Sequence, residues 1–335
     1  MRLYRKFETY LTNNKEVKDE IMTRYVIFLI DGYTINGNPI LVGTIRAYLE
    51  VVNKHYQTNG LARPFDHRSE SDAVTLLREQ EKFEKEPARR APLNDKMMVK
   101  MYELSLENSR GFRAAAWDFT NLGKYGGFRE QEFAMASRTK IRYYVCPNGD
   151  KVMRAFTNRN FILYDKDGGI LSALLEQPRA NIDGLGTLYD VQKNRMNNQI
   201  IKFIRVIDYP TYCPVESGLN IKTRANVLGK TGPEDPLCVY EGKNGIILYL
   251  TGTDMTDYFR LILRLVMPNI SNEELKLIST HSIRVFACVL LHEAGKDGPF
   301  IKLRLRWLSN CFEVYLRNTE TINSQHAFAL NDIHS

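Results

Sequence analysis

The sequence predicts a mainly α-helical protein with a small β-sheet, an α+β fold that is built from two domains. Three observations lead to this prediction. The chain has 335 residues, which is more than one average domain. Both of its ends carry apolar residues at helical spacing, and only its middle shows the alternation and β-branched clusters that are typical of strands. We expect a helical domain over 1–86, a linker over 87–94 and a larger domain over 95–335.

The first domain is predicted to contain three helices, over 15–30, 44–56 and 71–85, because apolar residues recur there every three or four positions. Thr44 is a candidate N-cap of the second helix. The linker follows as two prolines around the basic pair at 89–90, without any periodicity. Such a segment could follow a phosphate backbone, but a simple solvated connection explains its composition equally well.

The second domain is predicted to begin with helices over 95–106 and 111–125. Its middle carries four strand-like segments, and the chain becomes helical again from 254 almost to its end. The strand-like segments are 139–145, 160–164, 186–192 and 199–207.

The composition is that of a soluble globular protein, with 44% hydrophobic and 25% charged residues. We find no apolar run near the roughly 18 to 20 residues that span a membrane, and no secretory signal, so we expect a nuclear protein if the source is eukaryotic and otherwise a cytoplasmic one. The five cysteines are scattered without a C-x-x-C pair, which predicts neither a disulfide framework nor a zinc site. The net charge of +7 favours a polyanionic partner.

The C-terminal fifth of the chain groups residues that are suited to phosphodiester chemistry. His281 and Arg284 lie three residues apart on a helical pattern, so they share a face. Trp307 offers an aromatic N–H donor, and Tyr315 follows on a predicted short helix. Each of these residues has an ordinary structural explanation when it is taken alone, and their order along the chain is what favours a catalytic site.

Two further candidates lie upstream. Arg129 follows two glycines that permit a tight turn, and Glu132 can hold its guanidinium by a charge-assisted bond. Lys193 falls in an Asn-rich turn between two predicted strands, where a hairpin could carry it into a groove. Lys140 and Lys222 are alternatives for the same role.

In this order the residues resemble the motifs of the tyrosine recombinase (phage integrase) family. The segments 281–285 and 315–318 resemble Cre-type members, and 127–132 resembles the first arginine motif of the family. The segment 307–310 is closer to recombinases of eukaryotic mobile elements of the DIRS or Crypton kind. Three features depart from the pattern: the segment between Arg129 and Lys193 is long, Arg306 replaces a small residue, and Tyr315 lies one residue closer to Trp307.

The resemblance implies a site-specific DNA recombinase or integrase that works through a 3′-phosphotyrosyl intermediate, without metal, ATP or another cofactor. Arg129 and Arg284 would hold the scissile phosphate, and Tyr315 would attack it. The remaining roles that it implies are a base or orienting group, the acid for the leaving 5′-oxygen, and an N–H donor or support for the tyrosine, assigned to His281, Lys193 and Trp307.

The resemblance also implies double-stranded DNA as the partner, bound by a homo-tetramer on paired sites, with the N-terminal domain as a helical core-binding domain on the DNA. Neither a nucleotide nor a membrane is an expected partner. Two other functions remain open: a type IB topoisomerase-like enzyme, and a catalytically silent or regulatory DNA-binding protein derived from a mobile element. A basic globular protein with chance motifs is the third possibility.

Overall fold

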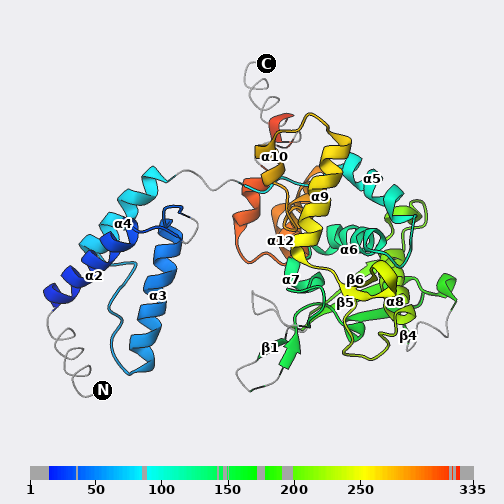
Figure 1. The fold of residues 1–335 in the computed structure, drawn as a ribbon, viewed down its shortest axis with the longest axis horizontal. Coiled ribbons are helices and arrows are strands. Elements are labelled where there is room, and N and C mark those ends of the chain that lie inside the picture. The colour runs from blue at the N-terminus through cyan, green and yellow to red at the C-terminus, as the bar shows by residue number, and fades with distance from the viewer. Residues whose placement is uncertain are drawn as a thin grey trace. The chain divides into compact units, whose positions relative to one another are not determined.

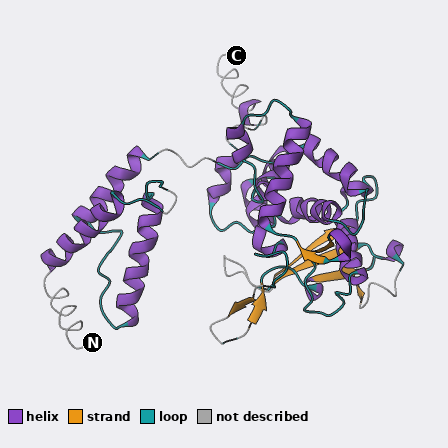
Figure 2. Ribbon diagram, in the orientation of Figure 1, coloured by secondary structure: helices purple, strands orange, loops and turns teal. Residues whose placement is uncertain are grey.

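The computed structural model describes residues 15–34, 37–84, 89–141, 143–145, 149, 151–171, 178–190, 199–316, 319 and 322–324. The chain divides into two compact units, Met1–Pro87 and Ala88–Ser335 (Figure 1). Helices predominate, and the strands of the described residues all lie in the second unit (Figure 2). The predicted class, mainly α with a small β-sheet, is confirmed.

The described residues of the first unit form three helices around a core of their own, which contains ten buried apolar residues. They are α2 (Lys15–Ile30), α3 (Val42–Thr58) and α4 (Asp72–Phe83). Thr44 does not cap α3, which contradicts the prediction: the helix begins at Val42 after Leu41. The Glu84 carboxylate, just beyond α4, accepts a hydrogen bond from the Val42 N–H at 2.5 Å and satisfies a free donor of the first turn.

The second unit contains eight α-helices among its described residues, and α6 is the central one. It packs against α5, α8 and α11, and it is buried around most of its circumference, as expected of a helix inside a core. The helices are α5 (Asp95–Ser105), α6 (Phe112–Gly126), α7 (Glu130–Phe133), α8 (Pro214–Val227), α9 (Gly252–Val266), α10 (Asn272–Lys276), α11 (Ser282–Glu293) and α12 (Gly298–Leu305). None of the described helices is long and apolar enough to cross a membrane.

A four-stranded antiparallel sheet in the order β4-β3-β5-β6 packs against α8. Its strands are β3 (Phe161–Tyr164), β4 (Ile170–Leu171), β5 (Gly184–Tyr189) and β6 (Gln199–Ile204). Two hairpins accompany it: β1 (Tyr143–Val145) with β2 (Lys151–Met153), and β7 (Val239–Glu241) with β8 (Ile247–Tyr249). Short 3₁₀ turns complete the unit: η1 (Asn158–Asn160), η2 (Arg179–Asn181), η3 (Pro210–Tyr212), η4 (Lys243–Gly245) and η5 (Asn310–Tyr315).

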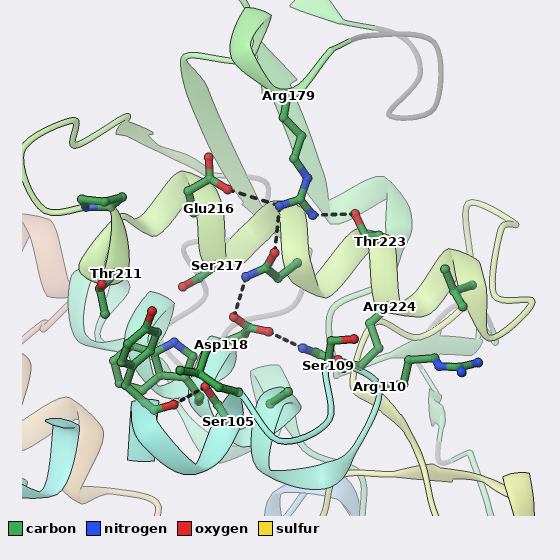
Figure 3. A pocket seen from close by; sticks show the side chains of 17 residues that line it. Ser105, Ser109, Arg110, Asp118, Arg179, Thr211, Glu216, Ser217, Thr223 and Arg224 are labelled. Carbon is green, nitrogen blue, oxygen red and sulfur yellow. Dashed lines mark hydrogen bonds and ion pairs between the residues drawn. The ribbon is translucent and has the colours of Figure 1, made fainter. Parts of the chain in front are cut away.

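A buried ion pair joins α6 to α8. Asp118 on α6 accepts a hydrogen bond from the Arg224 guanidinium on α8, and each side chain is 3% exposed. Asn220 donates a hydrogen bond to Asp118 and accepts one from Arg179. These residues line a cavity of about 590 Å³ (Figure 3). Burial raises the pKa of Asp118 even though Arg224 opposes the shift. A polar contact inside the core therefore ties the central helix α6 to α8.

Candidate functional site

The first arginine of the site is placed by the turn that ends α6. Gly127 adopts a left-handed conformation with φ 55°, and a Cβ atom there would lie 2.9 Å from Cδ2 of Leu305. Glycine satisfies both constraints at this position. The side chain of Phe128 is fully buried and anchors the turn, so that Arg129 leaves it from a fixed point.

Arg129 caps α7 and is held by Glu132, as the sequence predicts. Its backbone N–H donates to Glu132 Oε2 at 2.8 Å, and its Nη1 donates to Oε1 at 3.2 Å. The Arg129 side chain remains 24% exposed, whereas that of Glu132 is 8% exposed. One part of the guanidinium is thus fixed to the protein, and another part is open to solvent.

The second arginine comes from the first turn of α11. His281 is the N-cap of this helix, and Arg284 follows in the buried first turn, only 2% exposed. Arg284 Nη1 donates to the carbonyl oxygen of Gly127, the residue that ends α6. The turn that presents Arg129 therefore also fixes Arg284.

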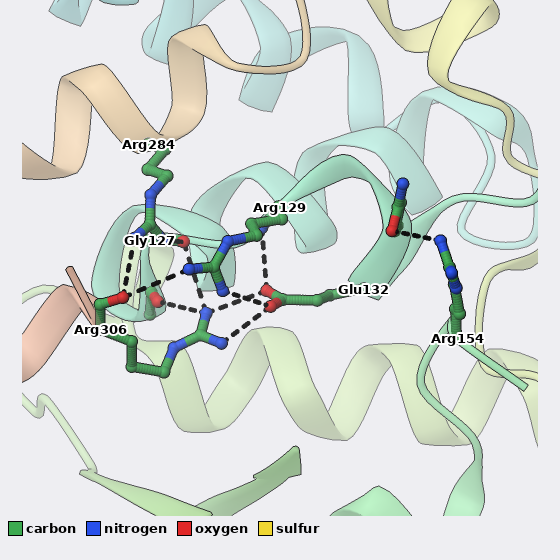
Figure 4. Close-up of polar contacts among 8 residues, drawn as sticks. Gly127, Arg129, Glu132, Arg154, Arg284 and Arg306 are labelled. Atoms are coloured by element: carbon green, nitrogen blue, oxygen red, sulfur yellow. Dashed lines mark hydrogen bonds and ion pairs between the residues drawn. The ribbon is translucent and has the colours of Figure 1, made fainter. Parts of the chain in front are cut away.

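The two guanidinium groups converge on one atom. Arg129 Nη2 and Arg284 Nη2 donate to the carbonyl oxygen of Arg306 at 3.2 and 3.3 Å (Figure 4). The end of α12 thus brings together the N-cap residue of α7 and a residue of α11, which are far apart in the sequence. Planar guanidinium donors in this arrangement suit the nonbridging oxygens of a phosphate.

Arg306 itself is a residue that sequence reasoning did not assign to the site. It ends α12 in a left-handed conformation with φ 58° and ψ 46°, which costs a non-glycine residue roughly 1–2 kcal/mol. Its side chain is 1% exposed and binds both Glu132 oxygens, at 2.8 and 2.9 Å. The only signal in the sequence was that a large basic residue stands where the resembling family has a small one.

The proposed nucleophile and base lie beside these arginines. His281 Nε2 and Tyr315 Oη are 3.2 Å apart. Trp307 packs against both, with ring centroids 6.5 Å from His281 and 6.3 Å from Tyr315, and the Arg284 guanidinium lies 4.2 Å from the indole ring. The indole Nε1 is buried and has no hydrogen-bond partner among the described residues, so a donor is left available in the site. Tyr315 lies at the end of the 3₁₀ turn η5 rather than on an α-helix.

Electrostatics favour an anion at this position. Burial, then Arg129 and Arg306, lower the pKa of Arg284. Burial disfavours ionised Glu132, but Arg306 and Arg129 outweigh it, and the pKa of this carboxyl is lowered. Arg129 and Arg306 are both ion-paired with Glu132, and Arg284 adds a third positive charge close to this single carboxylate, so that an added negative charge would be favourable here.

Lys193 lies outside the described residues. The strand before it, β5, ends at Tyr189, and the Arg306 guanidinium lies 3.6 Å from the centre of the Tyr189 ring. The alternative Lys222 is half-buried on α8 and donates to the carbonyl oxygens of Asn158 and Phe161 at 3.1 and 3.4 Å. Burial lowers its pKa to about 8. The other alternative, Lys140, is exposed ahead of β1.

Across the described residues, no cluster of three or more His, Cys, Asp or Glu side chains is placed to hold a metal ion. The candidate site is made instead of guanidinium, imidazole, indole and phenol groups. Of the six residues predicted from the sequence, five are brought together, namely Arg129, His281, Arg284, Trp307 and Tyr315.

Of three comparisons with known proteins, only the one with solved structures found matches to this chain. The profiles of known protein families do not match the chain, and no curated protein matches it. The XerA recombinase structure is 11% identical with a TM-score of 0.39, over 96% of this chain and 95% of that one. A Tn1549 transposon integrase in complex with transposon right end DNA is 12% identical with a TM-score of 0.43, over 98% of both chains.

A lambda integrase dimer bound to a core site is 12% identical with a TM-score of 0.36, over 93% of both chains. At such identities, and with TM-scores below 0.5, these similarities carry no argument about activity, which has to come from the site itself. These three structures are those of one recombinase and two integrases.

Proposed function

We propose that the chain is a tyrosine recombinase, a site-specific DNA recombinase or integrase that cleaves and rejoins DNA through a phosphotyrosyl bond on Tyr315. One observation carries the proposal: Arg129 and Arg284 converge on a single carbonyl oxygen beside a histidine–tyrosine pair 3.2 Å apart. A pair of cations, of which Arg284 is buried and Arg129 is partly exposed, next to a hydroxyl nucleophile and a base is an arrangement suited to phosphoryl transfer.

The first step is the binding of the scissile phosphate by the two arginines. Each donates one Nη2 hydrogen bond to the Arg306 carbonyl, which leaves further N–H groups for the nonbridging oxygens. A phosphate at this position also offsets the repulsion between Arg129 and Arg284. The free Nε1–H of Trp307 is a third donor for the same oxygens. Donors fixed in advance around the developing charge stabilise the transition state.

In the second step, the Tyr315 oxygen attacks phosphorus and His281 Nε2 accepts the phenol proton. The tyrosine–phosphorus bond forms while the bond from phosphorus to the 5′-oxygen breaks, which leaves a 3′-phosphotyrosyl link and a 5′-hydroxyl. The leaving oxygen takes a proton, and Lys193 is the residue that we propose as the donor. Attack by the 5′-hydroxyl of another strand reverses these steps and rejoins the DNA.

Trapping of the covalent intermediate tests this proposal. Nicked suicide duplexes drawn from the DNA that flanks the coding sequence release a short 5′-fragment on cleavage, so the protein stays attached. We expect the wild type to form a covalent protein–DNA adduct and Tyr315→Phe to form none, because the nucleophile is removed. Tyr209→Phe is the matched control, since Tyr209 is 68% exposed outside the site. An adduct that persists in Tyr315→Phe would show that the nucleophile is wrong.

Recombination exchanges four strands, so we further propose a homo-tetramer on two paired double-stranded DNA sites. A type IB topoisomerase with the same residues would act as a monomer. The stoichiometry of the adduct-bearing complex separates the two: four protomers on two duplexes support recombination. Relaxation of supercoiled DNA by single protomers, without exchange between duplexes, would favour the topoisomerase. Sequence-specific binding without any adduct would favour a silent DNA-binding protein.

A further inference from the structure

Arg306 is the most deeply buried charged residue of the site, and the steps proposed above do not use its side chain. Its side chain is 1% exposed, and its guanidinium lies 3.6 Å from the centre of the Tyr189 ring. It donates through Nη1 and Nη2 to the two Glu132 oxygens and through Nη2 to the Gly126 carbonyl at 3.2 Å (Figure 4). A left-handed helix end normally carries glycine, so this side chain is present in spite of an unfavourable backbone conformation.

The contacts of Glu132 explain what the side chain does. Arg306 approaches Glu132 Oε1 to 2.8 Å, whereas Arg129 approaches the same oxygen to 3.2 Å. Arg306 therefore makes the shorter ion pair. Without the Arg306 side chain, Arg129 would be the one cation of the described site that is still paired with Glu132. A close Glu132–Arg129 pair would neutralise the arginine that the phosphate needs.

The backbone of Arg306 acts on the same two arginines. Its left-handed conformation directs the carbonyl oxygen toward Arg129 Nη2 and Arg284 Nη2, at 3.2 and 3.3 Å. One residue thus fixes the spacing of the two guanidinium groups through its carbonyl and engages Glu132, the carboxylate that pairs with Arg129, through its side chain. Both contacts depend on a single turn at the end of α12.

Building on the proposed function, we propose that Arg306 is the positioning residue of the phosphate site: it engages Glu132 so that Arg129 stays available for the phosphate, and it sets the spacing between Arg129 and Arg284. Arg306 does not touch the phosphate and acts through the other two arginines. The proposed reaction thereby gains a positioning residue that the motifs do not assign.

Single-turnover adduct formation at saturating DNA tests this role in the full chain. Arg306→Gly suits the backbone conformation but removes the ion pair, so we expect adduct formation to slow by about 10²-fold, comparable to the loss of an oxyanion donor. Arg306→Lys keeps a positive charge near Glu132 but loses the pair of Nη donors that binds both carboxylate oxygens. Its rate of adduct formation should therefore lie between those of the wild type and Arg306→Gly. Arg304→Ala is the matched control, because Arg304 donates to the Lys202 carbonyl instead.

The decisive variant is the double substitution Arg306→Gly with Glu132→Gln. If Arg306 acts by engaging Glu132, removal of that carboxylate's charge releases Arg129, and the rate should recover at least tenfold over Arg306→Gly alone. A merely structural role predicts no recovery, because a second buried substitution only adds to the damage. No slowing in Arg306→Gly, or no recovery in the double variant, would overturn the inference while the wild-type adduct left the proposed function standing. A wild type without adduct would instead overturn the proposed function.

Discussion

Tyr315 and His281 have pKa shifts in opposite directions, and both shifts keep the groups in the protonation states from which the proposed step starts, a protonated phenol and a neutral imidazole. The wider gap between the two pKa values opposes the transfer itself, so the proton has to move as the phenol oxygen attacks phosphorus. Burial raises the pKa of the Tyr315 hydroxyl, so the phenol keeps its proton at neutral pH. Burial, followed by Arg284, Arg90 and Arg129, lowers the pKa of His281. The imidazole is therefore neutral at neutral pH and can accept a hydrogen bond from the phenol 3.2 Å away.

The lowered pKa of His281 predicts the pH dependence of cleavage. A base acts in its neutral form, so the second-order rate constant for adduct formation should be level at neutral pH. It should fall only when the pH drops below the ordinary histidine value of about 6.5. His281→Gln should slow the reaction by about 10²–10⁴-fold and abolish this acidic limb. Rates measured from pH 5 to 8 for both proteins check the prediction.

A wild-type rate that already falls above the ordinary histidine pKa would contradict the prediction, since it would require a raised pKa. An acidic limb that persists unchanged in His281→Gln would assign the titration to another group. Folding of the variant is followed in parallel by circular dichroism, so that loss of structure is not taken for loss of a base.

Single residues differed in how far the sequence could predict them. Arg129, Arg284, His281 and Tyr315 could be predicted because their order along the chain is itself a pattern. Arg306 could not, since its importance arises from a left-handed turn and from burial against Glu132, which depend on tertiary packing. The hydrogen-bonding state of the Trp307 N–H likewise depends on neighbours that are distant in sequence.

At the scale of elements, the ion pair between Asp118 on α6 and Arg224 on α8 joins two helices of the second unit inside its core. Removal of one partner leaves the other as an uncompensated buried charge. We expect Asp118→Asn to lower the free energy of unfolding of the second unit by about 3–5 kcal/mol at pH 7. Urea unfolding followed by tryptophan fluorescence measures this loss, since both tryptophans lie in that unit.

A double variant separates the contribution of the two charges to stability from the contribution of the volume that the two side chains fill. Asp118→Leu with Arg224→Met replaces both charges by apolar groups, and its stability should return close to that of the wild type. Glu273→Gln is the matched control, because the Lys276–Glu273 pair is well exposed and its loss should not be measurable. A cost for Asp118→Asn as small as that of the control would contradict the buried pair.

Helices with regular apolar spacing were predicted well, and elements that depend on long-range contacts were not. The predicted helix over 15–30 matches α2, and 111–125 differs from α6 by one residue at each end. The helix α8 was not predicted, since it is buried on several sides and lacks a single apolar stripe. Among the described residues of the strand-like segment 139–145, Tyr143–Val145 forms a strand, where β2 pairs with it.

At the scale of the whole molecule, the net positive charge comes from one unit. Met1–Pro87 contains 13 basic and 13 acidic residues, so the net charge of +7 belongs to Ala88–Ser335. That unit also carries the arginine site. Attraction to DNA should therefore come mainly from the second unit, whereas any contact of the first unit with phosphates has to come from individual side chains.

The salt dependence of DNA affinity separates these contributions, because each phosphate contact adds about 0.9 to the slope of log K against log salt. We expect a steep slope for Ala88–Ser335 alone, which has its own hydrophobic core. The full chain should give a steeper slope if its helical N-terminal unit also contacts the phosphates of the DNA, as a DNA-binding domain must. Affinities measured by fluorescence anisotropy between 50 and 300 mM salt give both slopes. Equal slopes would mean that the N-terminal unit contacts no phosphate, and a flat response of the full chain would exclude DNA as the partner.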